Sequence, residues 1–243
     1  MAFENIAPAV AAVRERIAAA CARSGRKPEE VRLMGVSKFH PTGAIEAARK
    51  AGLGLFGENR VQEAAAKFPG RGALGEGRPG MELHMIGSLQ RNKAKAAVSL
   101  FDCIQSVDRD ELIAELAKFA SARLGQGQGF APLGVFLELN AGEESKSGYR
   151  NEDALLRGAE KLLAAPGLAA CGIMIMAPFT GDIAAVRRAF RSLKALQGRL
   201  VSRFPEGDWS CLSMGMSGDF ETAIEEGSTL VRIGTAIFGE RGE

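Results

Sequence analysis

Short apolar segments alternate with helix-like segments along the whole of this 243-residue chain. Eight segments are typical of buried strands, and each is separated from the next by one segment with helical spacing of its apolar residues. Alternation of this kind indicates parallel strands joined by right-handed crossovers, because each helix returns the chain to the same edge of the sheet. The predicted strands are residues 31–37, 53–57, 82–86, 101–107, 133–139, 172–176, 210–214 and 230–233.

Eight such repeats at this length predict an α/β fold, a closed (β/α)8 TIM barrel that forms a single domain over residues 1–243. Apolar residues at helical spacing in residues 3–23 predict an extra N-terminal helix ahead of the first strand. The alternative fold is an open, doubly wound sheet. That fold has a glycine-rich turn directly after its first strand, whereas residues 37–41 here read Ser-Lys-Phe-His-Pro.

Charge and cysteine content exclude several function classes. The chain has 31 Lys and Arg against 29 Asp and Glu, so its net charge of +2 offers no global field for nucleic acid or membrane. No apolar run reaches the roughly 18 residues of a transmembrane helix, and the N-terminus does not fit a signal peptide, so we expect a cytoplasmic protein. The four cysteines form no C-x-x-C pair, which predicts buried reduced thiols rather than a zinc site.

The residues that end each strand are the candidate site, because functional groups of this fold lie at the carboxyl ends of the strands. Lys38 is the one lysine among them and follows the first strand. It is either an ordinary surface lysine or a Schiff-base lysine, since desolvation lowers the pKa of an amine and makes it a better nucleophile. Asn59 follows the second strand and is either a helix cap or part of the site.

Two loops predict a phosphate site. The segment after the seventh strand contains Ser217, which either caps a helix that begins near Gly218 or binds an anion together with that helix's backbone N–H groups. Gly234 and Thr235 follow the eighth strand. Phosphates in this fold are commonly held by the loops after strands seven and eight, so the two loops together favour the phosphate interpretation.

Three further side chains have two interpretations each. Arg232 lies within the last strand, where a charge is costly unless it is paired, so it either forms an ion pair with a strand carboxylate such as Glu138 or faces a ligand. His84 is expected to be a hydrogen-bonded core histidine, because it has no serine or cysteine partner at a spacing that suggests a hydrolase triad. Lys146, in the polar loop after the fifth strand, is either solvated or part of a lid.

Several motifs, taken in order, resemble the pyridoxal phosphate homeostasis protein family, single-domain relatives of the alanine racemase N-terminal barrel. The resemblance implies that Lys38 forms an aldimine with pyridoxal 5′-phosphate (PLP) and that Arg232 faces the pyridine nitrogen. It also implies that Asn59 lies beside the ring, and that Ser217 with the backbone at Met216, Gly234 and Thr235 holds the phosphate. The chain departs from the family pattern at Phe39, His40 and Arg60. The matching segments are Val36-Ser37-Lys38, Phe56-Gly57-Glu58-Asn59, Val61-Gln62-Glu63, His84-Met85-Ile86-Gly87, Leu89-Gln90, Asn92-Lys93, Ser145-Lys146-Ser147-Gly148, Leu212-Ser213-Met214-Gly215-Met216-Ser217 and residues 227–239.

The resemblance implies a monomeric PLP carrier that exchanges the cofactor with apo PLP-dependent enzymes or the free pool and catalyses no reaction. Arg232 supports this, because a cation beside the pyridine nitrogen disfavours ring protonation and leaves a poorer electron sink. We also expect no second domain to deliver a base, and the only tyrosine, Tyr149, is a poor substitute. Two alternatives remain: an amino acid racemase with Lys38 as its base, and a sugar-phosphate barrel enzyme without a cofactor.

Overall fold

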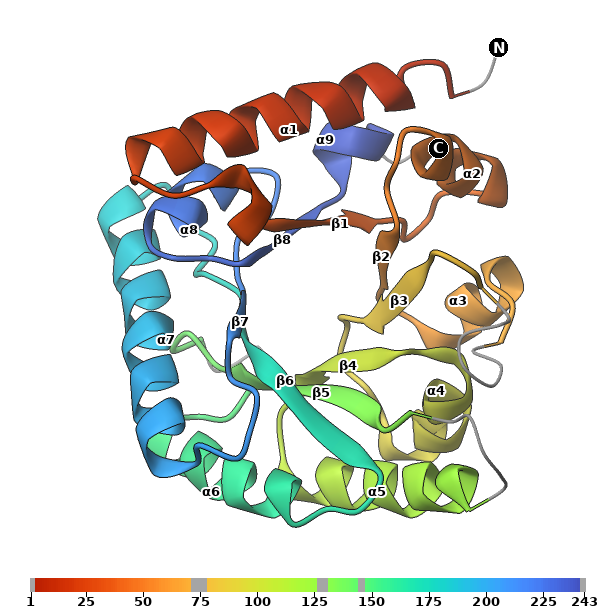
Figure 1. Ribbon diagram of the computed structural model, residues 1–243, viewed down its shortest axis with the longest axis vertical. Coiled ribbons are helices and arrows are strands. Elements are labelled where there is room, and N and C mark those ends of the chain that lie inside the picture. The colour runs from red at the N-terminus through yellow and green to blue at the C-terminus, as the bar shows by residue number, and fades with distance from the viewer. Residues whose placement is uncertain (1–2, 71–77, 126–130, 144–146, 241–243) are drawn as a thin grey trace.

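Eight parallel strands close into a barrel in chain order, surrounded by a ring of helices (Figure 1). Closure occurs where β1 pairs with β8, with Arg32 opposite Leu230 and Gly35 opposite Ile233. The predicted (β/α)8 barrel is therefore confirmed, and the open doubly wound sheet is excluded. The computed structural model describes residues 3–70, 78–125, 131–143 and 147–240. The strands are β1 (Arg32–Val36), β2 (Leu55–Glu58), β3 (Glu82–Met85), β4 (Cys103–Val107), β5 (Leu133–Leu139), β6 (Leu168–Ile175), β7 (Cys211–Ser213) and β8 (Leu230–Ile233).

Helices follow the strands as the alternating pattern predicts. Short 3-10 turns at Pro28–Glu30 and Arg91–Lys93 precede β1 and α4. The main hydrophobic core lies between the strands and this helical layer and includes large buried side chains such as Phe56 and Phe190. The helices are α1 (Ile6–Arg23), α2 (Thr42–Lys50), α3 (Val61–Lys67), α4 (Ala94–Leu100), α5 (Asp110–Leu124), α6 (Glu152–Leu163), α7 (Ile183–Arg203), α8 (Phe220–Glu225) and α9 (Thr235–Phe238).

The predicted N-terminal helix is confirmed as α1, which lies outside the barrel beside α8 and α9 (Figure 1). It buries the apolar stripe that its spacing predicts, including Ile6, Val10, Val13 and Ile17. The helix thus covers the seam where the first and last strands meet.

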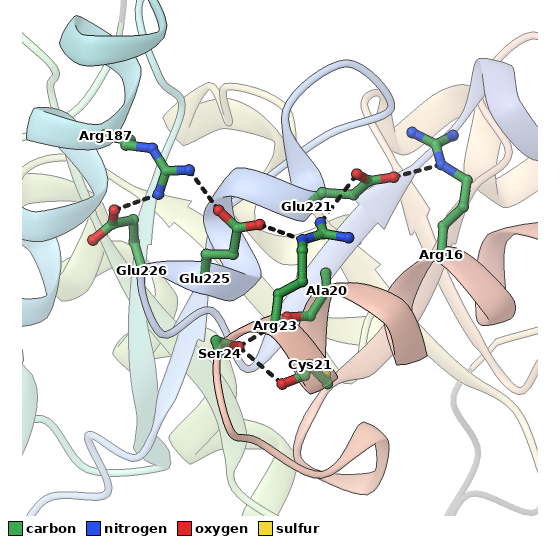
Figure 2. A network of polar contacts seen from close by, with 9 residues as sticks. All are labelled: Arg16, Ala20, Cys21, Arg23, Ser24, Arg187, Glu221, Glu225 and Glu226. Atoms are coloured by element: carbon green, nitrogen blue, oxygen red, sulfur yellow. Dashed lines mark hydrogen bonds and ion pairs between the residues drawn. The ribbon is translucent and has the colours of Figure 1, made fainter.

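Ion pairs reinforce this seam on the solvent side, where arginines from two helices alternate with glutamates of α8 (Figure 2). Arg16 of α1 binds Glu221 at 2.7 Å, and Arg23 of α1 binds Glu225 at 2.8 Å. Arg187 of α7 binds Glu225 from the opposite side. Exposed pairs of this kind contribute little singly, so their main effect is to set how the three helices sit together.

Several element boundaries differ from the prediction. Strand β6 begins at Leu168 rather than residue 172, because its first residues pair with Leu133 and Gly134 of β5. Alanines dominate that start and carry no strand signal of their own. Helix α5 begins at Asp110, and Asp108 before it pairs with Arg109 rather than capping the helix.

Other predictions concern features that the structure describes only partly. The four cysteines are free thiols as predicted, but only Cys21 and Cys103 are fully buried, whereas Cys171 and Cys211 are partly exposed. The described part of the chain contains no cluster of side chains suited to a metal ion. None of the described helices is both long and apolar enough to cross a membrane. Lys146 and most of the glycine-rich stretches at 70–80 and 125–129 lie outside the described residues.

Candidate functional site

Lys38 lies directly after β1, at the carboxyl end of the barrel. Since β1 pairs with β2 on one side and β8 on the other, Asn59 and Gly234 follow the two strands that flank β1, and Gly234 lies against Val36. Lys38 and Asn59 are half-buried, whereas Ser37 before the lysine is fully buried. Three of the predicted site residues are thus gathered at the ends of adjacent strands.

A buried polar cluster anchors the backbone before Lys38. The Ser37 hydroxyl donates a hydrogen bond of 2.7 Å to Glu58 Oε1. Lys67 of α3 donates to the Ser37 carbonyl and to Glu58, each at 2.8 Å. Glu58 is fully buried, and burial raises its pKa although Lys67 and Ser37 act in the opposite direction. The sequence motifs include Glu58 but not Lys67. The spacing of four residues between Glu63 and Lys67, which suits a helical ion pair, is the sequence feature that could have pointed to Lys67.

The residue after Lys38 has a strained backbone. Phe39 has a φ of +67°, a left-handed conformation that non-glycine residues rarely adopt. Its N–H donates to Glu63, which Lys67 also binds at 2.7 Å. The same cluster therefore holds the chain on both sides of Lys38, which fixes where the lysine leaves the barrel wall.

The rim beside Lys38 is formed by the residues at which the chain departs from the family pattern. Phe39 is about half exposed, and the Arg60 guanidinium lies 6.0 Å from its ring centroid. His40 stacks on Phe238 of α9 at 5.2 Å between ring centroids. Burial and the charge of Lys67 lower the pKa of His40, so the ring is neutral at physiological pH. These substitutions change the rim and leave the strand ends intact.

Asn59 packs closely against the end of β3. A Cβ atom at Gly87 would lie 2.4 Å from the Asn59 carbonyl oxygen, a distance no side chain tolerates. The glycine that follows β3 therefore lets the backbone of Asn59 approach. Glycine has no Cβ, so it permits close backbone approach of this kind.

The loops after β7 and β8 meet, as the phosphate interpretation requires. Ser217 Oγ accepts a hydrogen bond of 3.4 Å from the Ala236 N–H, in the first turn of α9. Ser217 and Gly234 are half-buried, and Thr235 is exposed. A hydroxyl and the start of a helix thus share one small region at the barrel mouth.

The local structure around Ser217 excludes the first of its two interpretations, the helix cap. Helix α8 begins at Phe220, with Asp219 at its cap position, so Ser217 does not cap it. The Met216 N–H donates to Asp219 Oδ1 at 2.6 Å, which ties this loop to itself. Gly215 has a φ of +97°, and this turn directs Ser217 toward α9 instead.

Arg232 points into the barrel and is almost completely buried. Its guanidinium donates to the Ser213 carbonyl and hydroxyl, each at 2.7 Å, and to the Ile175 carbonyl at 3.0 Å. Burial lowers the pKa of Arg232 to about 10 against the attraction of Glu138 and Asp219, so it stays charged at neutral pH. Of the two interpretations of Arg232, the ion pair with Glu138 is not formed, because among the described residues the guanidinium hydrogen-bonds to neutral oxygens.

Glu138 instead accepts hydrogen bonds from Ser147 at 3.1 and 3.0 Å. Burial raises its pKa to about 7, with Asp108 adding to the effect and Ser147 and Arg232 opposing it. The pKa of Glu138 is higher in the folded protein than in the unfolded chain. Its contribution to the free energy of unfolding is therefore fully present below the unfolded pKa and is lost as pH rises through the folded pKa.

We expect Glu138→Gln to remove this pH dependence. A shift from 4.5 to about 7 corresponds to about 3 kcal/mol of unfolding free energy lost by the wild type between pH 4.5 and 8. Urea denaturation of both proteins without ligand measures it. Relative to the wild type, the variant should become more stable as pH rises across that interval. If the free energies of unfolding of the two proteins change in parallel with pH, the pKa of Glu138 is not raised.

Tyr149 is held away from any role as a base. Its ring is buried, and its hydroxyl donates to Asp110 Oδ1 at 3.0 Å. Burial and this carboxylate raise the pKa of Tyr149 above its ordinary value. A hydroxyl that donates to a carboxylate and resists ionisation does not abstract protons, which agrees with the sequence-based view of this residue.

A large cavity lies at the opposite, amino-terminal mouth of the barrel. Its volume is about 1040 Å³, and its lining includes Glu82, His84, Cys103, Cys171 and Cys211. These residues precede the carboxyl-end residues on their strands, so this cavity does not coincide with the predicted site. In this fold, functional residues lie at the carboxyl end, and we assign the candidate site there.

Comparisons with known proteins identify the family of this chain. The model of the alanine racemase N-terminal domain matches residues 9–242. The pyridoxal phosphate homeostasis protein of Escherichia coli K12 is 41% identical over 243 residues, which cover 98% of each chain. The chain belongs to this family.

Members of the family include a solved relative with a bound cofactor. PipY of Synechococcus elongatus, solved with PLP bound, is 35% identical, with a TM-score of 0.76 over 93% of this chain and all of that one. Alanine racemase of Bacillus anthracis is only 16% identical with a TM-score of 0.65, so it shows the shared fold alone. The family assignment confirms the resemblance drawn from the motifs.

Proposed function

We propose that this protein binds PLP at the carboxyl end of its barrel and acts in vitamin B6 homeostasis without catalysing a reaction. The observation that carries the proposal is that Lys38, Asn59 and Gly234 follow adjacent strands at one end of the barrel, with a charged Arg232 deeper in the same barrel. The family membership and the PLP-bound relative support it. Residues 1–243 would form one PLP-binding domain, monomeric and cytoplasmic, that exchanges PLP with apo-enzymes.

The residues at this end suit the chemical groups of PLP. When bound, PLP supplies an aldehyde that bonds covalently to an amine and a ring that withdraws electrons. Lys38 would provide the amine, and Arg232 would face the pyridine nitrogen, with Asn59 beside the ring. The contact between Ser217 and the Ala236 N–H supports a phosphate position formed with Gly234 and Thr235.

Met216 is part of the proposed phosphate position through its backbone. Its N–H donates to Asp219 in this structure, and burial raises the pKa of Asp219. A bound phosphate would therefore replace the Asp219 carboxylate as the acceptor of this N–H. Met216 contributes a backbone donor only, since its side chain is exposed.

The proposed lack of turnover rests on two groups. Arg232 remains charged, and a cation beside the pyridine nitrogen keeps the ring unprotonated and a weak electron sink. Tyr149 is engaged by Asp110 and does not serve as a base. Lys38 would thus hold the cofactor without a partner acid or base to move the Cα proton of an amino acid.

Two measurements on the purified protein test this proposal. We expect added PLP to give a visible absorbance band that survives gel filtration and is lost on borohydride reduction. We expect no deuterium uptake at Cα when the loaded protein is incubated with L-alanine in D2O. Rapid uptake by the wild type, absent in Lys38→Ala, would identify a racemase instead. Absence of any absorbance band would leave the sugar-phosphate enzyme as the better interpretation.

A further inference from the structure

A continuous row of buried polar side chains crosses the interior of the barrel. Arg232 Nη1 lies 2.7 Å from Ser213 Oγ, which lies 2.6 Å from Gln105 Oε1. Gln105 Nε2 lies 2.7 Å from His84 Nδ1, and His84 Nε2 contacts Glu82 Oε1 at 2.5 Å. The row uses β8, β7, β4 and β3, and it ends at the amino-terminal cavity.

The hydrogen bonds of this row all run in one direction. Arginine has donors only, so Ser213 Oγ accepts from Arg232 and gives its own hydrogen to Gln105 Oε1. The Gln105 amide N–H then faces His84 Nδ1, which must accept. The proton of neutral His84 is therefore on Nε2 and is donated to Glu82. A cation and an anion end the row, and each uncharged member has one orientation.

The anionic end of the row is stable. Although burial acts in the opposite direction, the hydrogen bond from neutral His84 and the charge of Arg32 hold the pKa of Glu82 below its ordinary value. Arg32 forms an ion pair with Glu82 at the mouth of the barrel. Glu82 thus remains an acceptor at all physiological pH values, which keeps the direction of the row fixed.

Polar side chains at these positions are unusual for the fold. Barrel interiors are dominated by branched apolar residues, and a buried polar group is costly unless it is hydrogen-bonded. Ser213 and Gln105 are fully buried, and His84 is almost so. Their hydrogen bonds offset that cost within the row, and the row ends at the Arg232 guanidinium through Ser213.

We propose that Ser213, Gln105 and His84 are positioning residues that hold the Arg232 guanidinium in one orientation toward the pyridine nitrogen of bound PLP. The orientation toward PLP rests on the proposed function. The positioning of Arg232 does not depend on it, because every hydrogen bond of the row is present in the protein without ligand. The carbonyls of Ser213 and Ile175 fix two donors of Arg232, and the row adds the contact that fixes its rotation.

The test compares variants of the row in the full-length protein. Ser213→Ala removes the hydroxyl, Gln105→Met the amide, and His84→Phe the acceptor of Gln105. His84→Asn is the conservative variant, because its side-chain oxygen can still accept from Gln105. Cys103→Ala is the matched control: Cys103 is buried inside the barrel, close to Gln105 on β4, and takes no part in the row.

The first readout is 15N NMR of the Arg232 side chain in the protein without PLP. We expect the first three variants to speed hydrogen exchange of its N–H groups roughly tenfold, and His84→Asn and Cys103→Ala to leave it unchanged. The second is PLP titration, in which the same three variants should bind roughly tenfold more weakly. Unchanged Arg232 exchange in Ser213→Ala and Gln105→Met would overturn the proposal, as would loss of protection in His84→Asn equal to that in His84→Phe.

These outcomes separate the two proposals. A wild type that binds no PLP contradicts the proposed function, while Arg232 exchange still decides whether the row positions it. If the wild type binds PLP but the variants leave hydrogen exchange of Arg232 unchanged, only the positioning role is contradicted. Ser213→Ala removes only one oxygen atom, so Arg232 exchange can still be measured in this variant if a larger substitution prevents folding.

Discussion

Lys38→Ala should abolish the visible absorbance that the protein acquires with PLP and weaken retention of the cofactor by at least roughly 100-fold, or about 2.7 kcal/mol. The lysine amine supplies the covalent bond, whereas the proposed phosphate and pyridine contacts are reversible. Absorbance after gel filtration measures the loss. Mass spectrometry of the borohydride-reduced wild type should locate the label on the peptide that contains Lys38.

The control for this change is Lys95→Ala, which removes an exposed lysine of α4. It should keep both the absorbance and the label. Lys38 is half-buried at a strand end and outside the hydrophobic core, so its replacement should change unfolding free energy by less than about 1 kcal/mol. A borohydride-stable label that persists in Lys38→Ala would show that another lysine forms the bond.

The fold could be predicted from the sequence because its signal is repeated. Each of the eight strands is followed or preceded by a segment of different period, and no single boundary decides the topology. The boundaries themselves were less accurate, as the alanine-rich start of β6 illustrates. There the pairing with β5 overrides weak local preference.

The strand ends were predictable for a related reason. A barrel brings all carboxyl ends to one mouth, so Lys38, Asn59 and Gly234 follow from the order of strands alone. The hydrogen-bond partners of Arg232 could not be predicted in this way, because side-chain contacts inside a barrel depend on the register between strands. Ser213 and Gln105 lie 108 residues apart, and no local pattern joins them. The nearby carboxylate of Glu138 was the obvious partner by charge, yet neutral oxygens hold the guanidinium.

The polar cluster behind Lys38 was also hidden from the sequence. Its members Ser37, Glu58 and Lys67 come from the end of β1, from β2 and from α3, and meet only after the second repeat packs against the first. They matter because the lysine itself has to leave the barrel wall at a fixed point. This makes Lys67, a residue with no direct role toward a ligand, a sensitive position.

Lys67→Met should destabilise the protein by about 3 kcal/mol at pH 8, since it leaves the fully buried Glu58 carboxylate without its cation. Without Lys67, burial should raise the pKa of Glu58 further. A raised pKa means that stability is retained at low pH, where Glu58 is protonated, and is lost as pH rises. The difference from the wild type should therefore be small at pH 5 and grow toward pH 8, measured by urea denaturation without ligand.

Two variants separate this effect from the loss of an ordinary ion pair. Lys161→Met breaks the exposed pair with Asp110 and should cost less than about 1 kcal/mol. The double variant Glu58→Gln, Lys67→Met should recover most of the stability, because the introduced glutamine is uncharged and still accepts from Ser37. If the double variant is as unstable as Lys67→Met, packing of the lysine stem rather than its charge supports the backbone at Lys38. Retention of PLP should then fall equally in both variants, whereas the charge explanation predicts that it recovers in the double variant.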